Sequence, residues 1–261
     1  MIKCNFCNQD VEKLVKCHII PEAFFQYIKY KSNSPKASSL SMVTNSNGQA
    51  PMRRSRKGWY DSKLVCLKCE RKFSQYDNYA IRLLLKNEKN HKAIIVNGSL
   101  GGWEITSFDY NKLSLFFISV LWRASASSLP QFKRIKIGNI MDIAKKCIEK
   151  KSPDEKTFSF ILSRFSDDMG RAFILDPHKE YRTGAYSKHH IYRFYLSGGY
   201  IIYINVDKNH PFPSPDNFFT IQKNQPLRIN NKGAFIVSKE FSAMQRVHKD
   251  AVKALNIKRY N

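Results

Sequence analysis

Four cysteines in two closely spaced pairs are the residues of this sequence with the clearest chemical potential. Cys4 and Cys7 form one C-x-x-C pair, and Cys66 and Cys69 form a second. Each pair can present two thiolates from a tight turn, and four thiolates complete the tetrahedral shell of a structural zinc ion. The spacing therefore predicts one zinc ion held by both pairs.

The sequence has six cysteines, a number that also allows three disulfides. A reducing compartment and the paired spacing both favour metal binding over disulfides. Cys17 and Cys147 then remain outside the two pairs. Cys147 is predicted to be a core residue, and a buried apolar role is predicted for Cys17 ahead of a role as a ligand.

His18 lies between the two pairs, in the run Lys-Cys-His-Ile-Ile-Pro at residues 16–21. Phosphodiester hydrolysis needs a water deprotonated near neutral pH, which suits histidine, and a hard cation that neutralises charge on the phosphate. Magnesium and manganese prefer oxygen ligands, which Asp61 and Glu70 supply, whereas the soft Cys17 thiolate is a poor ligand for them. A purely structural histidine is the alternative interpretation.

The carboxylates have simpler interpretations as well. Asp61 can stabilise a turn, and Glu70 can be a helix-start carboxylate that is favoured by the helix dipole. Asp77 shares a helix face with Glu70, but two turns separate them by about 10 Å, too far for one ion. Asp77 is therefore predicted to support the site or to flank a phosphate.

The charge of the chain predicts a polyanionic partner. Lys and Arg outnumber Asp and Glu by 44 to 21 in 261 residues, which gives a formal net charge of +23. Nucleic acid is the first expectation for such a protein. A cationic cluster, Arg53, Arg54, Arg56 and Lys57, would lie beside His18 if the two cysteine pairs meet around one zinc ion. A solvated loop is the alternative for this cluster.

No membrane association is expected. The start of the chain has no apolar region typical of a signal peptide, and the most apolar run, residues 113–122, has about half of the roughly 20 residues that a membrane span needs. The protein is predicted to be soluble and cytoplasmic. A protein partner is the alternative to nucleic acid.

The patterns along the chain predict an α+β fold. Apolar positions at three- and four-residue steps predict a helix over residues 67–89, and two further helices are expected at 111–125 and 140–150. Strands are expected at 158–165, 172–175, 191–196, 200–206, 218–221 and 234–237, and a last helix at 239–255. The Gly-rich turn at 97–102 predicts a zinc-stapled module over residues 1–96 and an antiparallel-sheet domain with packed helices over 97–261. The second domain is the candidate for binding substrate or a partner.

The first ninety or so residues resemble the zinc-containing HNH (ββα-metal) endonucleases, a treble-clef type similar to phage endonuclease VII-like resolvases. The residues that carry the resemblance are Cys4, Cys7, the run at 17–21, Asp61, Cys66, Cys69 and Glu70.

The resemblance implies a role for each of these positions. His18 would be the general base, Glu70 a ligand of a catalytic magnesium or manganese ion, and Asp61 the group that orients the histidine. The family usually has an aspartate where Cys17 stands, and its last helix histidine has no match between Glu70 and Ala80.

The leading prediction is therefore a metal-dependent endonuclease that acts on nucleic acid, DNA ahead of RNA, in a phage or antiviral-defence setting that the resemblance suggests. The alternatives are a non-catalytic zinc-stapled module that binds nucleic acid and a protein-binding scaffold. Cys17 and the absent helix histidine favour the first of these alternatives.

Overall fold

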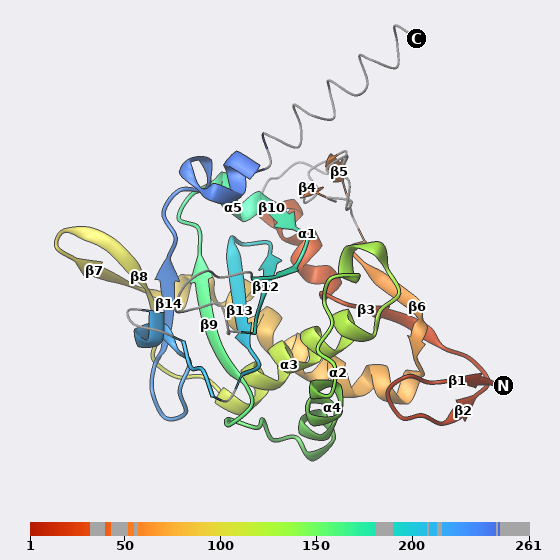
Figure 1. Cartoon of the computed structure of the whole chain (residues 1–261). Helices are drawn as coiled ribbons and strands as arrows, with labels where there is room; N and C mark the ends of the chain where they lie inside the picture. Colours follow the sequence, from red (N-terminus) through yellow and green to blue (C-terminus); the bar gives the residue numbers. More distant parts are fainter. Residues whose placement is uncertain are drawn as a thin grey trace, which may run out of the picture.

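The chain is a mixed α/β structure built around a seven-stranded sheet (Figure 1). The computed structural model describes residues 1–31, 40–42, 52–54, 57–180, 190–207, 209–212, 216–243 and 245. Its helices are α1 (Glu22–Lys31), α2 (Leu67–Ala80), α3 (Tyr110–Ala126), α4 (Ile140–Lys150) and α5 (Asp168–Ala172). A π-helical segment (Ile81–Lys86) and a 3-10 turn (Glu88–Asn90) continue α2, and further 3-10 turns are Pro130–Phe132, Asp216–Phe219 and Phe235–Val237.

The large sheet has the order β11-β12-β13-β9-β14-β8-β7. Its strands are β7 (Lys92–Val96), β8 (Ser99–Ile105), β9 (Ser159–Arg164), β11 (His178–Lys179), β12 (Ile191–Leu196), β13 (Tyr200–Asn205) and β14 (Leu227–Asn231). Neighbouring strands are antiparallel except β9 and β14, which pair in parallel. The expected sheet with packed helices is therefore present, with one parallel pair added.

Three small sheets accompany it. β1 (Ile2–Lys3) pairs with β2 (Asp10–Val11), and β3 (Val15–His18) pairs with β6 (Tyr60–Val65). β4 (Leu40–Met42) lies between β5 (Met52–Arg54) and β10 (Phe173–Leu175).

Two of the predicted strands are wrong. The segments predicted at 218–221 and 234–237 are instead largely 3-10 turns, and β14, which the apolar pattern did not predict, takes a place inside the sheet. Short apolar runs do not distinguish a strand from a turn that inserts its aromatic side chain into a core. Phe219 and Phe235 do this, because both pack into one hydrophobic cluster on a face of the sheet.

Alternating side chains divide the central strands between two hydrophobic clusters. Ile202 and Ile204 belong to the main core, whereas Ile201 and Tyr203, their neighbours on β13, belong to the cluster on the other face. This is the two-residue period of an extended strand. α3 packs against β13, and α2 and α4 pack against α3, so the helices extend the main core away from the sheet (Figure 1).

α3 is the central helix, as its apolar composition predicts, and its residues from Leu113 to Ser125 are all buried. An aromatic group connects it to the cysteine-rich start of the chain. Phe6 meets Phe73 of α2 edge to face at 5.2 Å and Trp122 of α3 at 4.9 Å. Such contacts contribute about 0.5–1.5 kcal/mol each beyond the burial of area.

The predicted boundary between residues 96 and 97 falls in the turn between β7 and β8. The two strands pair with each other, and both belong to the large sheet. The hairpin and the β1–β2 pair lie at opposite ends of the molecule (Figure 1). The main hydrophobic core contains residues from Cys4 to Ile229, on both sides of the boundary.

None of the helices in the described part of the chain is long and apolar enough to cross a membrane. α3, the most apolar, has 17 residues.

Phe6→Ala is expected to lower the free energy of unfolding by about 3–5 kcal/mol, because it removes the ring between α2 and α3 and leaves a cavity. Phe218, which is 59% exposed, offers a matched control. Phe218→Ala should change stability by less than about 1 kcal/mol. Chemical denaturation followed by fluorescence measures both values. Because the core crosses residue 96, the parent protein should unfold in one transition, and two separate transitions would contradict a shared core.

Candidate functional site

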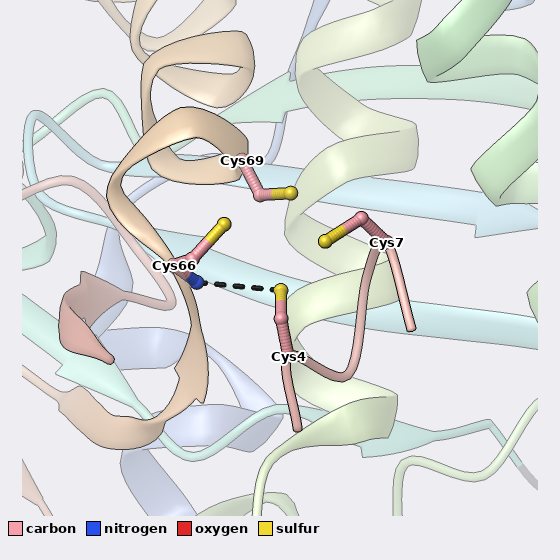
Figure 2. A group of neighbouring side chains, drawn as sticks. All are labelled: Cys4, Cys7, Cys66 and Cys69. Atoms are coloured by element: carbon pink, nitrogen blue, oxygen red, sulfur yellow. Dashed lines mark hydrogen bonds between the residues drawn. The ribbon is translucent and has the colours of Figure 1, made fainter. Parts of the chain in front are cut away.

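The four paired cysteines converge on one point (Figure 2). Cys4 and Cys7 come from the turn between β1 and β2, where Asn8 takes a left-handed conformation (φ 59°) and its N–H donates to the Cys4 carbonyl. Cys66 precedes α2, and Cys69 lies in its first turn. Their sulfur atoms all lie within 4.8 Å of one another.

This cluster can hold a metal ion such as zinc. Zinc–sulfur bonds of about 2.3 Å in a tetrahedron place sulfurs about 3.8 Å apart, so a small contraction of the cluster completes the shell. Four sulfur ligands leave no open position, which is the arrangement of a structural zinc site rather than a catalytic one.

The pKa values of the thiols show which cysteines must lose a proton when the cluster binds a metal ion. Burial would raise the pKa of Cys4, but backbone N–H groups of Cys7 and Cys66 lower it to about 7, and the Cys66 N–H lies 3.3 Å from the Cys4 sulfur. Burial and the adjacent Cys66 and Cys7 thiols raise the pKa of Cys69. At neutral pH a partly ionised Cys4 therefore lies beside a protonated Cys69 thiol, and a bound metal ion would displace the proton of Cys69.

Cys66→Ala should reduce zinc from about one ion per chain to nearly none and should unfold the N-terminal residues, because metal binding contributes folding free energy there. Cys147→Ala is the matched control, since Cys147 is a buried cysteine of α4 outside the cluster. Elemental analysis and circular dichroism give the two readouts. A parent protein that contains no zinc and is fully folded would contradict a metal site here.

His18 ends β3 with a partly exposed ring, whose side chain is 22% accessible. Its Nε2 lies 3.0 Å from the Lys57 carbonyl oxygen and 3.7 Å from Oε2 of Glu22. A carbonyl oxygen only accepts hydrogen bonds, so Nε2 carries the proton of the neutral ring and Nδ1 is the acceptor. The Tyr60 ring packs against the imidazole at 5.7 Å.

Asp61 does not contact the His18 ring. In the β3–β6 pair, Cys17 is opposite Asp61 and His18 is opposite Tyr60. The side chains of Asp61 and His18 therefore belong to opposite faces of the two-stranded ribbon. The Asp61 carboxylate instead accepts hydrogen bonds from the Lys63 N–H at 2.8 Å and the Ser127 hydroxyl at 2.9 Å. It therefore holds the turn after α3, which agrees with the simpler of its two interpretations.

Asp61 should make stability depend on pH. Burial raises its pKa, but hydrogen bonds from Lys63, Ser127 and Ser128 outweigh this and place it below the usual value. The stabilisation is thus present above the unfolded-state pKa of about 3.9 and is lost as pH falls through the folded-state value. Asp61→Asn should lower the melting temperature at pH 7 and flatten its decline on acidification. Asp142→Asn, at an exposed position of α4, should leave the decline unchanged.

Cys17, which precedes His18 on β3, lies close to Glu70 of α2. Cys17 is completely buried, and burial followed by the nearby Glu70 charge raises its pKa well above the usual value, so it is a protonated thiol close to the Glu70 carboxylate. Burial likewise raises the pKa of Glu70, against the effect of Arg123. The Oε2 atom of Glu70 is buried without a hydrogen-bond partner.

Arg123 is not recognisable from the sequence as part of the surroundings of His18. Its guanidinium is fully buried and binds Asp77 through two hydrogen bonds of 2.8 and 2.7 Å. It also donates to the His18 carbonyl at 2.7 Å, and it lies over the Phe73 ring at 5.2 Å. Burial would lower its pKa, but the Asp77 carboxylate raises it, so Arg123 stays charged.

The sequence does indicate that Arg123 needs a buried acid, although it does not say which one. An arginine inside a helix that is otherwise apolar must find a buried acid, because an unpaired buried charge costs several kcal/mol.

A second metal site is not assembled among the residues that the structure describes. Within them, the four cysteines are the one group of three or more metal-binding side chains that come together. Glu70 offers one free oxygen, next to a thiol and a guanidinium. Magnesium or manganese needs more oxygen ligands than this, so the donor set does not fit such an ion.

Part of the predicted cationic cluster can be placed. Lys57 is exposed, and its backbone carbonyl binds the His18 ring. Arg53 and Arg54 belong to β5 by their backbone, but their side chains, and all of Arg56, lie outside the described residues.

Comparisons with protein-family models, with curated proteins and with solved structures find no match to this chain. The resemblance to HNH endonucleases therefore depends on the motif residues alone.

Proposed function

We propose that this chain is a nucleic-acid endonuclease in which His18 is the general base for phosphodiester hydrolysis. The observation that carries the proposal is the state of the His18 ring. The Lys57 carbonyl holds Nε2–H, so Nδ1 is the basic atom at a partly exposed position. A histidine in this tautomer can take a proton from water near neutral pH.

The order of elements supports the same proposal. The cysteine turn and β3 come first, and β6 and α2 follow after a segment that contains α1, β4 and β5, with His18 at the end of β3 and the second cysteine pair at the helix start. This is the order of the zinc-containing ββα-metal nucleases, and we assign residues 1 to about 90 to a treble clef of that kind. DNA is the preferred substrate because the resemblance is to DNA-cleaving enzymes.

The residues around His18 have separate tasks in this proposal. Arg123 fixes the backbone of His18 to α2 and α3, and the protonated Cys17 thiol lies next to the Glu70 carboxylate without adding a charge. The net charge of +23 draws a polyanion to the surface. Among the described residues next to Arg123, Glu70 offers one free carboxylate oxygen, so no step is assigned to magnesium or manganese, although the resemblance implies such an ion.

A non-catalytic zinc-stapled module that binds nucleic acid is the second candidate. The observation in its favour is Arg123, whose positive charge lies beside Glu70 and Asp77. In an active nuclease of this class a divalent ion would neutralise these carboxylates. In the binding module, His18 and the lysines would contact phosphates without cleavage.

His18→Ala should abolish cleavage of plasmid and single-stranded DNA, while zinc content, melting temperature and nucleic-acid affinity stay nearly unchanged. The variant removes the proton acceptor but no thiolate and no buried contact of Arg123, which binds the backbone. Cleavage should be measured without added divalent ions and with magnesium or manganese, and affinity by fluorescence anisotropy at several salt concentrations.

The outcomes separate the candidates. Cleavage by the parent and its loss in His18→Ala support the endonuclease. Salt-dependent binding without cleavage under any condition supports the binding module. Absence of both activities would favour a protein-binding scaffold, and cleavage that persists in His18→Ala would remove His18 as the base.

A further inference from the structure

A cavity of about 530 Å³ lies on the part of the molecule beyond residue 130. It is formed by the start of α4, by β11 and β12, and by the chain that follows β13. Its volume falls within the roughly 300–1,000 Å³ of typical small-molecule sites. None of its lining residues belongs to the His18 site or to the cysteine cluster.

The inner wall of this cavity is apolar. Ile137, Tyr192 and Val206 are buried, and Ile140 and Ile143 of α4 are partly exposed. The phenol of Tyr192 donates to the Lys136 carbonyl at 2.5 Å, so its one polar atom is already bound and the ring presents an apolar surface. Such a wall suits a planar or apolar group of a ligand.

One side of the cavity is basic. Lys179 Nζ lies 3.0 Å from His190 Nδ1, and both residues line the cavity. An ammonium group has no acceptor, so Nδ1 accepts and Nε2 carries the proton of His190. Lys136 adds a second ammonium, which donates to the Ser125 carbonyl at 3.0 Å and keeps further protons for a ligand. These groups form a donor set for phosphate oxygens.

The one carboxylate among the lining residues already accepts hydrogen bonds from the protein. Asp207 also lines the cavity, but its Oδ2 accepts from His210 Nδ1 at 2.8 Å and its Oδ1 from the Asn209 N–H at 2.9 Å. The backbone is held as well, because the Val206 N–H donates to the His190 carbonyl at 3.0 Å. The lining thus carries two lysine ammonium groups against one carboxylate that is already hydrogen-bonded.

We propose that this cavity binds a nucleoside phosphate, with the base against the apolar wall and the phosphate on Lys179 and His190. The exposed amides of Asn139 and Asn209 at the rim can hydrogen-bond the edge of a base, since an amide both donates and accepts. The ligand is either a free nucleotide or the end of a nucleic-acid strand, because both present the same chemistry. The proposal does not depend on cleavage at His18.

Isothermal titration calorimetry of the full chain tests it with adenosine and uridine monophosphates, the two nucleosides, inorganic phosphate and a short single-stranded oligonucleotide. At least one monophosphate should bind about tenfold or more tightly than inorganic phosphate, because the wall buries its base. Lys179→Gln and His190→Gln should each lower the affinity for the monophosphate by about tenfold, which is the effect of losing one charged hydrogen bond. Lys146→Gln, an exposed position of α4, is the matched control and should change affinity by less than about twofold.

The two sources are distinguished by the oligonucleotide. If the site binds the end of a strand, Lys179→Gln lowers the affinity for the oligonucleotide as well. If the site binds a free nucleotide, the affinity for the oligonucleotide does not change in this variant. Failure of both monophosphates to bind, equal affinity for inorganic phosphate, or an equal loss in Lys146→Gln would overturn the proposal. Because His18→Ala leaves this cavity intact, its binding result is independent of the cleavage test.

Discussion

The buried guanidinium of Arg123 is the contact on which the arrangement around His18 depends. It joins α3 to Asp77 of α2 and to the last backbone carbonyl of β3, and it packs on an aromatic ring of α2. A charge without water requires all of these partners, and loss of one partner of such a pair typically costs about 3–5 kcal/mol. Arg123 therefore fixes α2, α3 and the end of β3 relative to one another.

Two constraints of different chemistry act on α2. The cysteine cluster holds its first turn to the β1–β2 turn, and the Asp77–Arg123 pair holds it about two turns further along. His18 and Glu70 lie between these two fixed points. The position of the imidazole thus depends on residues from both sides of residue 96, and a module that ended there would lack the arginine.

The sequence predicted what depends on local patterns. The two C-x-x-C pairs meet as expected, and the helices at 111–125 and 140–150 are α3 and α4 within one residue, because strongly periodic or fully apolar runs are clear signals. It did not predict that Arg123 reaches Asp77 or that Asp61 turns toward Ser127. Those contacts join residues 46 and 66 positions apart, and no local pattern reports which face of a strand meets which helix.

The cysteine cluster also determines how the intervening chain can change over evolution. Cys4 and Cys66 are 62 positions apart, so a bound metal ion closes a large loop that contains α1, β4 and β5. The entropy of closing a loop rises only with the logarithm of its length, and doubling the loop costs about 0.6 kcal/mol. Insertions and deletions between the two cysteine pairs therefore cost little free energy of loop closure, so related chains can differ in this segment while the four cysteines keep their arrangement.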